Sequence, residues 1–258
     1  MNAAAPALSV RALGIGAGGR HLLQHCDFDL HRGEFLAILG RNGCGKSLTL
    51  HTLAGLRPPQ SGTVTLAGAD LARLKRREVA LQLGLLPQDR EESLPLNVLE
   101  STLIGRHPHL RAWQQSGAED ELRARSALAD FGLDACAHRL LATLSGGEQR
   151  RAAMAMLLTQ APGVYLLDEP TNHLDPHQQL QVMDVFRDQC TRGAAVIATL
   201  HDPALADRYA DRVLLLFGDG RWRLGPAAEV LNAAELGALY LTPFNELGTP
   251  GRRAFVAA

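Results

Sequence analysis

Residues 40–47 read Gly-Arg-Asn-Gly-Cys-Gly-Lys-Ser, and this stretch decides the fold of the 258-residue chain. The apolar run Phe35–Leu39 precedes it, and the run Leu48–Leu56 follows it before two prolines, Pro58 and Pro59. These flanks predict a buried parallel strand and then a helix. A strand, a glycine-rich loop and a helix in this order are the setting of a phosphate-binding P-loop.

The residue types of the loop suit a phosphate chain. Gly40, Gly43 and Gly45 allow the backbone N–H groups to turn inward as a nest for phosphate oxygens. The N-terminus of the following helix adds the positive end of its dipole. Lys46 is then expected to reach the β- and γ-phosphates, and Ser47 to ligate Mg²⁺.

The four cysteines, Cys26, Cys44, Cys136 and Cys190, are scattered and form no CxxC pair. This pattern indicates neither a disulfide framework nor a zinc knuckle. Cys44 lies inside the phosphate loop, where positive surroundings could lower its pKa and make it alkylatable. We therefore expect a thiol reagent to block nucleotide binding, and ATP to protect against it.

The overall composition points away from nucleic acid and membrane insertion. The formal net charge is -1, which gives no basic field for a nucleic-acid partner. No apolar run is long enough to span a bilayer, and the N-terminus lacks a basic-then-apolar secretion signal. The sequence therefore predicts a soluble, cytoplasmic protein.

Apolar periodicity and turn residues predict an α/β fold with a mainly parallel sheet. Residues 8–30 read as short antiparallel strands, and a shift to polar, helix-forming sequence after residue 88 predicts an inserted helical subdomain. Strands are expected at 63–66, 83–88, 164–167, 194–200 and 212–217, and helices at 71–82, 98–104, 117–131, 134–141, 145–160, 176–192 and 227–240. The tail 242–258 is rich in Gly and Pro and has no assigned role.

A second glycine element, Ser145-Gly146-Gly147-Glu148, opens one of these helices. Ser145 and Glu148 have the spacing of a capping box. Glycines at a capped helix N-terminus also make an anion site. From the residues alone, a second phosphate site and a merely well-capped helix remain equally good interpretations.

Three chemistry-bearing residues follow buried strands. Asp168 and Glu169 end one strand and His201 ends another, and ligands bind at such carboxyl edges. Asp168 suits a Mg²⁺ shell, and Glu169 is placed to polarise a water against the γ-phosphate. His201 could contact the γ-phosphate or be an ordinary turn histidine. His107 and His109 are interpreted as surface-loop residues rather than metal ligands, because no third ligand is near.

Taken in order, these motifs resemble the ATP-binding subunit of an ABC transporter over nearly the whole chain. The most specific part is Leu144–Glu148 a short distance before Leu166–Pro170. The resemblance implies one ABC ATPase domain over 1–258, with a P-loop (RecA-like) core in 1–88 and 160–258. It also implies an N-terminal antiparallel β subdomain, and a helical subdomain at 89–159 that contains the signature motif.

The same resemblance implies residue roles. Glu169 would be the catalytic base, His201 the switch histidine, and Gln88 the residue that senses both Mg²⁺ and the attacking water. Two chains would pack head to tail, so that Ser145, Gly146 and Gly147 bind the γ-phosphate of ATP held by the partner. The implied nucleotide-binding residues are Gly40, Arg41, Asn42, Gly43, Cys44, Gly45, Lys46, Ser47, Leu48, Ser145, Gly146, Gly147, Glu148 and Asp175. The implied metal ligands are Ser47, Gln88 and Asp168.

Within the family, three segments resemble those of the ATPases that serve importers of iron–siderophore, haem and cobalamin complexes. They are Leu96–Glu100, Gly105–His109 and Thr171–Asp175. The expected partners are a second ATPase subunit, integral membrane permease subunits docking near residues 88–109, and a periplasmic binding protein. The expected place is the cytoplasmic face of the inner membrane. The alternative is a soluble ABC ATPase without a permease, such as a ribosome-associated translation factor or an assembly ATPase.

Two positions depart from the family pattern. Ala17 falls near the place where the family usually has an aromatic residue that stacks on adenine. Leu48 stands where Thr usually follows Lys-Ser, which removes a possible hydroxyl contact to the α-phosphate. Neither departure affects Lys46 or Glu169, so ATP hydrolysis is still expected.

Overall fold

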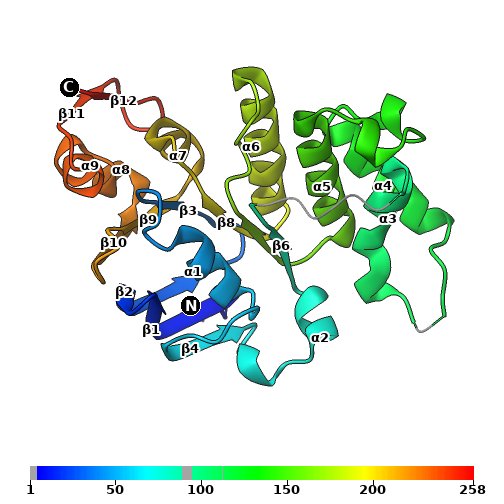
Figure 1. Cartoon of the computed structure of the whole chain (residues 1–258), viewed down its shortest axis with the longest axis horizontal. Coiled ribbons are helices and arrows are strands. Elements are labelled where there is room, and N and C mark those ends of the chain that lie inside the picture. Colours follow the sequence, from blue (N-terminus) through cyan, green and yellow to red (C-terminus); the bar gives the residue numbers. More distant parts are fainter. Residues whose placement is uncertain (1–4, 89–94, 112) are drawn as a thin grey trace.

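A mainly parallel six-stranded sheet, with strand order β10-β9-β3-β8-β7-β6, runs through the chain (Figure 1). The computed structural model describes residues 5–88, 95–111 and 113–258. Five strands are parallel and the edge strand β10 is antiparallel. They are β3 (Phe35–Leu39), β6 (Leu83–Leu86), β7 (Val164–Leu167), β8 (Ala195–Thr199), β9 (Arg212–Leu216) and β10 (Trp222–Pro226). The predicted α/β class with a parallel core is confirmed.

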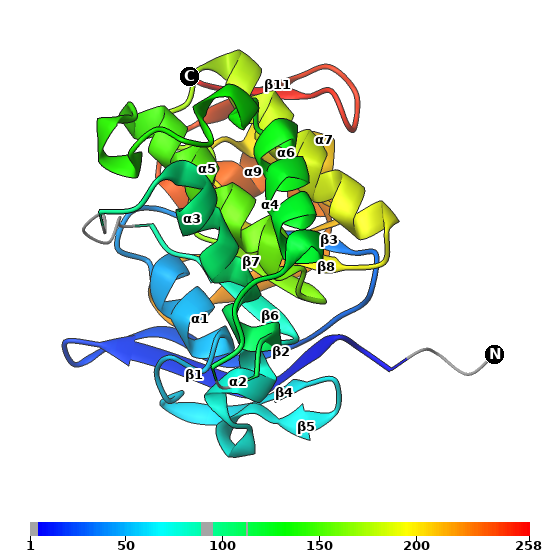
Figure 2. The same ribbon diagram turned by 90° about the vertical axis from the view of Figure 1, so that its right-hand side faces the viewer.

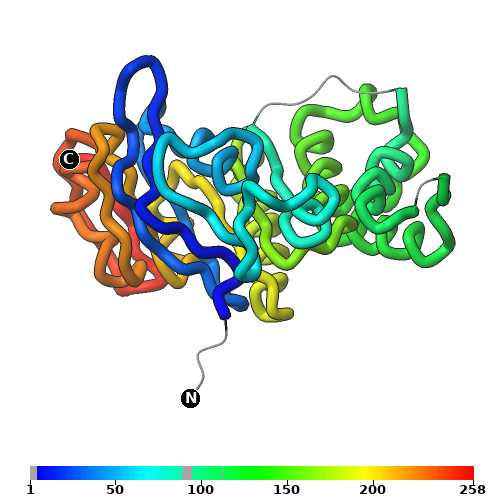
Figure 3. Tube along the Cα trace, turned by 90° about the horizontal axis from the view of Figure 1, so that it is seen from below, coloured from blue at the N-terminus to red at the C-terminus, as the bar shows by residue number. Residues whose placement is uncertain are grey.

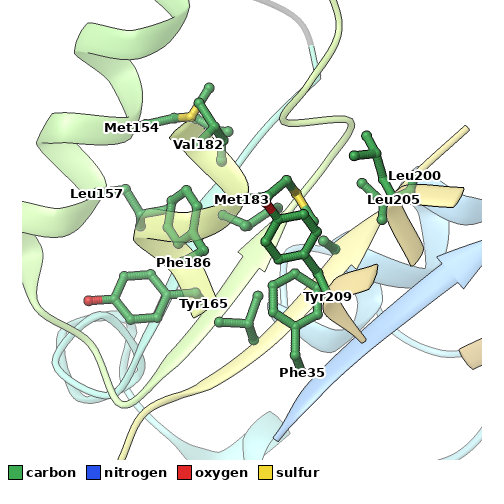
Figure 4. Close-up of a cluster of buried hydrophobic side chains, with 14 of the residues drawn as sticks. Phe35, Met154, Leu157, Tyr165, Val182, Met183, Phe186, Leu200, Leu205 and Tyr209 are labelled. Atoms are coloured by element: carbon green, nitrogen blue, oxygen red, sulfur yellow. The ribbon is translucent and has the colours of Figure 1, made fainter. Parts of the chain in front are cut away.

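Both faces of the parallel part of this sheet are buried, which explains why strands such as β3, β7 and β8 are continuous apolar runs. On β3, Phe35 and Leu39 point into one core cluster, while Leu36 and Ile38 point into the other. Three helices contribute apolar side chains to the first cluster: α5 (Gly146–Gln160), α6 (Pro176–Thr191) and α7 (Pro203–Tyr209). Figure 4 shows its aromatic centre, where the ring centroids of Tyr165 and Phe186 lie 5.6 Å apart.

The second cluster is closed by the N-terminal antiparallel sheet, in the order β2-β1-β4-β5. Helix α1 (Lys46–Leu53) lies between the two sheets and contributes Leu50 and Leu53 to this cluster. The predicted antiparallel hairpin of residues 8–30 is confirmed, with its turn at Gly18 and Gly19. The four strands are β1 (Leu8–Ala17), β2 (Arg20–Leu30), β4 (Ser61–Leu66) and β5 (Ala69–Asp70).

A helical part lies at one end of the molecule, away from the N-terminal sheet and the C-terminal segment (Figure 3), and it faces the viewer in Figure 2. It consists of α3 (Val98–Leu103), the 3-10 helix η2 (Ile104–His109), α4 (Ala118–Asp130), the 3-10 turns η3 (Asp134–Cys136) and η4 (Leu141–Thr143), and α5. The expected start of the insertion at residues 89–94 lies outside the described residues. Asn97 caps α3 by accepting from the Glu100 N–H, as the sequence predicts.

Two predicted helices are wrong, because hydrogen bonds to other segments or to neighbouring residues interrupt the helical backbone there. Residues 134–141 form 3-10 turns, since the carbonyls of Ala137 and Arg139 accept from Leu99 and Val98 at the start of α3. Residues 71–82 split into η1 (Leu71–Arg73) and α2 (Arg76–Ala80). There the Glu78 carboxylate accepts from the Lys75 N–H and starts a new helix.

The predicted helix 227–240 is likewise two helices, α8 (Ala227–Val230) and α9 (Ala233–Tyr240). The break lies at Asn232, whose extended backbone and side-chain oxygen cap α9 by accepting from the Glu235 N–H. The unassigned tail forms the hairpin of β11 (Phe244–Leu247) and β12 (Ala254–Ala257), which packs against α7 and α9.

Candidate active site

The P-loop connects β3 to α1 at the carboxyl edge of the parallel sheet. Gly43 and Gly45 have φ values of +76° and +104°, a region that side-chain-bearing residues rarely adopt. Lys46 is buried, and its Nζ donates to the Gly40 carbonyl at 2.9 Å. The ammonium group is therefore held within the loop whose N–H groups are expected to bind phosphate.

Asp168 lies directly after β7, with 0 % of its surface exposed. Its Oδ1 accepts from Thr199 Oγ1 at 2.7 Å. Its Oδ2 is buried and has no hydrogen-bond partner among the described residues. A buried carboxylate oxygen needs a partner, and a hydrated cation beside a phosphate chain supplies one. The residues thus fit the predicted Mg²⁺ site.

Glu169 is the centre of a hydrogen-bond cluster. Its Oε2 accepts from Gln88 Nε2 at 2.9 Å and also from Asn172 Nδ2, while Oε1 lies 2.7 Å from His201 Nε2. Its φ is +49°, and its backbone N–H donates to Thr199 Oγ1 at 2.8 Å. A left-handed backbone at a non-glycine residue is strained and concentrates at functional sites. The three residues predicted to be catalytic are therefore brought together around one carboxylate.

A second contact connects this cluster to the P-loop. Ser47 Oγ donates to Gln88 Oε1 at 3.4 Å, and the Gln88 amide group then donates to Glu169. Gln88 thus lies between the predicted metal ligand Ser47 and the carboxylate of Glu169. The series of contacts from Ser47 through Gln88 and Glu169 to His201 therefore connects the start of α1 with the segments that follow β6, β7 and β8.

The second glycine element forms the N-terminus of α5, as predicted. Ser145 accepts from the Glu148 N–H, and Glu148 Oε2 accepts from the Ser145 N–H at 2.7 Å. The Ser145 hydroxyl and backbone bonds lower the pKa of the Glu148 carboxyl. The described contacts of Ser145 and Glu148 stay within α5 and Arg139. The structure therefore does not bring them to the P-loop of their own chain.

The start of α5 instead lies beside the segment that leads into α6. A Cβ on Gly147 would lie 3.5 Å from Leu174 Cδ2 and 3.7 Å from the His173 carbonyl oxygen. Asp175 caps α6 by accepting from the Gln178 N–H at 2.8 Å, so the helix predicted at 176–192 begins where expected. Ser145–Gly147 thus lie beside the segment that ends in Asp175, at the start of α6.

The expectation of a low pKa for Cys44 is wrong. Its side chain is buried, 5 % exposed, and burial raises the pKa of the thiol despite the nearby Lys46 ammonium. The turn at Gly218 packs against the loop, because a Cβ on Gly218 would lie only 3.0 Å from Cα and Cβ of Cys44. Arg41 and Asn42 are exposed, while Leu48 packs partly against the second core cluster.

Sequence reasoning missed three residues of the site: Thr199, Asn172 and Arg150. Thr199 joins Asp168 to the Glu169 backbone, and a lone polar residue at the carboxyl end of an apolar strand was its signal. Of the histidine pair, His107 is exposed, whereas His109 is half-buried and its Nε2 bonds the Gln160 carbonyl oxygen at 2.8 Å. Within the described ranges, His, Cys, Asp and Glu form no group of three or more suited to a metal.

Comparison with known proteins identifies the family. The profile of the ABC transporter family matches residues 23–172. This chain belongs to that family. A hemin import ATP-binding protein, HmuV of Gloeobacter violaceus, is 42% identical over 216 residues, covering 81% of this chain and 78% of HmuV. The achromobactin transport ATP-binding protein CbrD of Dickeya dadantii is 36% identical over 240 residues, covering 93% and 88%.

Solved structures agree. A metal-chelate type ABC transporter in an inward-facing conformation superposes with a TM-score of 0.83 at 29% identity, covering 98% of this chain and 97% of that chain. A dimeric ATP-binding cassette in a post-hydrolysis state with ADP and phosphate gives 0.74 at 26% identity, covering 85% and 98%. This ABC transporter chain is thus an ATP-binding subunit and an ATPase. In the part of the chain that the structure describes, no helix has the length and apolarity needed to cross a bilayer.

Proposed function

We propose that this ABC ATPase drives import of an iron chelate, haem or a ferric siderophore, through a membrane permease. The main support for ATP hydrolysis is the position of the Glu169 carboxylate at the sheet edge where the P-loop begins. Gln88, Asn172 and His201 all contact this carboxylate. The relatives named for hemin and achromobactin support the cargo class, and cobalamin complexes are a further candidate.

In the proposed mechanism, the P-loop residues 40–48 bind the phosphate chain and Lys46 neutralises charge on the β- and γ-phosphates. Glu169 accepts the proton of the attacking water. His201 and Gln88 fix the orientation of that carboxylate and contact the γ-phosphate side of the site. All three act from strand ends, which hold them in place more rigidly than loops would.

Ser47, Gln88 and Asp168 would hold Mg²⁺ beside the phosphates. The metal would supply charge neutralisation at the bridging oxygens. Asp168 is oriented by its hydrogen bond from Thr199, and its buried Oδ2 has no hydrogen-bond partner within the described ranges. The hydrogen bond from Ser47 to Gln88 brings the other two ligand oxygens together.

The second anion site is proposed to act on the partner's ATP. Ser145, Gly146, Gly147 and Glu148 lie apart from their own P-loop, so they fit a head-to-tail homodimer with two composite sites. The N-terminus of the fifteen-residue helix α5 lies there and supplies the positive end of its dipole. Asp175, next to this element, would lie at the same dimer contact.

The proposed domain arrangement is a single ABC ATPase domain, with a core in 1–88 and 160–258 and a helical subdomain at 89–159. The proposed assembly adds two membrane permease subunits and a periplasmic binding protein that delivers the chelate. The ATPase pair would sit peripherally on the cytoplasmic face of the inner membrane.

The test uses tagged Glu169→Gln protein expressed in its native cell and purified with ATP. Losing the base should lower turnover by about 10²- to 10⁴-fold while ATP binding persists, which traps the closed dimer. A polytopic permease should co-purify in a two-to-two complex. Lys46→Ala is the control, because it should bind neither ATP nor a partner chain in an ATP-dependent way. Ribosomal proteins, or a soluble complex alone, would overturn the transport role.

The cargo is decided with the recovered permease reconstituted in vesicles. Wild-type ATP turnover is measured with the binding protein loaded in turn with haem, a ferric siderophore or a corrinoid. Stimulation by one iron chelate alone would assign the cargo. Stimulation by the corrinoid alone would contradict the iron-chelate proposal and leave the ATPase assignment intact.

A further inference from the structure

Arg150 is a buried cation that touches both catalytic strand ends. It lies on α5, five residues after Ser145, and is 6 % exposed. One guanidinium nitrogen, Nη1, donates to the carbonyl oxygens of Pro87 at 2.5 Å and Gln88 at 3.4 Å. The other, Nη2, donates to the carbonyl oxygens of Asp168 and, at 3.2 Å, Glu169.

These carbonyls belong to two neighbouring strands. β6 and β7 pair in parallel, so residues 87–88 and 168–169 leave the sheet side by side. The planar guanidinium presents two terminal nitrogens in a fixed fork, which reaches both chain segments at once. A lysine has one nitrogen and a glutamine one amide group, so neither can replace it at both strand ends.

Because Arg150 lies on α5, these hydrogen bonds connect the helix to both strand ends. The residue lies little more than one helical turn from the N-terminus that contains Ser145, Gly146 and Gly147. Gln88 and Glu169, whose carbonyls it binds, also bond each other through their side chains at 2.9 Å. A shift of α5 along its axis therefore moves the backbone that holds both catalytic side chains.

We propose that Arg150 is the positioning residue that couples the two ATP sites of the dimer. This inference rests on the composite dimer proposed above. In that dimer Ser145–Gly147 bind the partner's ATP, whereas Gln88 and Glu169 act on the ATP of their own P-loop. Arg150 joins these two groups within one chain through a single side chain. Closure on one ATP thereby aligns the base for the other, and hydrolysis becomes cooperative in ATP.

The test compares Arg150→Gln with wild type in ATP titrations of steady-state turnover. Wild type should give a Hill coefficient approaching the number of sites, about 2. Arg150→Gln should give about 1, with kcat lower by roughly 10- to 100-fold because a displacement on the order of 1 Å suffices for this loss. The affinity for a fluorescent ATP analogue, which reports P-loop binding, should stay unchanged.

The matched control is Arg151→Gln on the same helix. Arg151 Nη1 donates to the Phe131 carbonyl at 3.1 Å and joins α5 to α4, away from the strand ends. It should alter thermal stability but leave the Hill coefficient near that of wild type. If Arg150→Gln does not fold, Arg150→Lys serves, since its one nitrogen can reach one strand end and should also lose cooperativity.

Three results would overturn the coupling role: a wild-type Hill coefficient of 1, an unchanged coefficient in the Arg150 variants, or an equal loss in Arg151→Gln. The proposed function is judged separately, by whether Glu169→Gln forms an ATP-trapped dimer. That variant combined with Arg150→Gln should still trap a dimer. Coupling can therefore fail while the composite dimer stands.

Discussion

Arg253→Met should destabilise the whole chain, although only five residues follow Arg253 in the sequence. Its Nε and Nη2 donate to Asp207 Oδ1 at 2.8 and 2.5 Å, and its backbone N–H donates to Oδ2 at 2.9 Å. The two side chains are 3% and 1% exposed. Nη1 and Nη2 also donate to the carbonyls of Leu231 and Ala227, so the tail hairpin is joined to α7 and α8.

The expected magnitude follows from burial. Removing one member of a buried ion pair leaves an uncompensated charge and costs about 3–5 kcal/mol. For a chain of about this size, 1 kcal/mol moves the thermal midpoint by roughly 2–4 °C. The melting temperature of Arg253→Met should therefore fall by roughly 6–20 °C.

Urea unfolding followed by circular dichroism gives the free energy directly. The neighbouring Arg252 is exposed, so Arg252→Met is the control and should change stability by less than about 0.5 kcal/mol. Removing both charges, in Asp207→Leu with Arg253→Met, should recover most of the loss because the fully buried Asp207 charge is removed too, and Glu246, which Arg253 Nη1 contacts at 3.2 Å, is 32% exposed to solvent. An Arg253→Met loss equal to that of Arg252→Met, or a double variant worse than the single, would refute the buried-pair reasoning.

Two further predictions concern protonation and thiol chemistry. With a thiol reagent at neutral pH, Cys136 should be alkylated well before Cys44, because the Cys44 thiol is buried and its pKa is raised. Peptide mapping that found Cys44 modified first would contradict this prediction. The pKa of Glu148 is lowered from 4.5, so ionised Glu148 stabilises the fold above that pH, and this contribution is lost as pH falls through the lowered folded-state value. The stability difference between wild type and Glu148→Gln should therefore be full at pH 7 and shrink below pH 4.5, and a constant difference would show that ionisation is not involved.

The parts of the fold that the sequence predicted well are those governed by local rules. Asn97 and Asp175 mark helix starts by side-chain caps, and the apolar run of β3 has the length and composition of a doubly buried strand. Each signal lies within a few residues of the element that it specifies. The same holds for the P-loop, whose positive-φ glycines are required by the turn itself.

The breaks within the predicted helices 71–82 and 227–240 arise from local caps at Glu78 and Asn232, whereas the other failures arise from partners distant in sequence. Residues 134–141 have helix-forming composition, but Ala137 and Arg139 give their carbonyls to α3, which starts about forty positions earlier. The tail was left without a role because the partner of Arg253 lies 46 positions before it. Cys44 was assigned a low pKa from its charged neighbours alone, whereas the contact with Gly218 that helps to bury it comes from a distant turn.

The hydrogen bonds of Glu169 constrain where a water can meet the proposed base. A carboxylate offers about four lone-pair sites. Gln88 and Asn172 occupy both sites of Oε2, and His201 occupies one of Oε1. An ionised carboxylate only accepts, so His201 Nε2 must carry the proton of this contact. The remaining site is on Oε1, so the attacking water is expected beside His201. Asn172 thus helps to decide which oxygen acts as the base, by keeping Oε2 engaged.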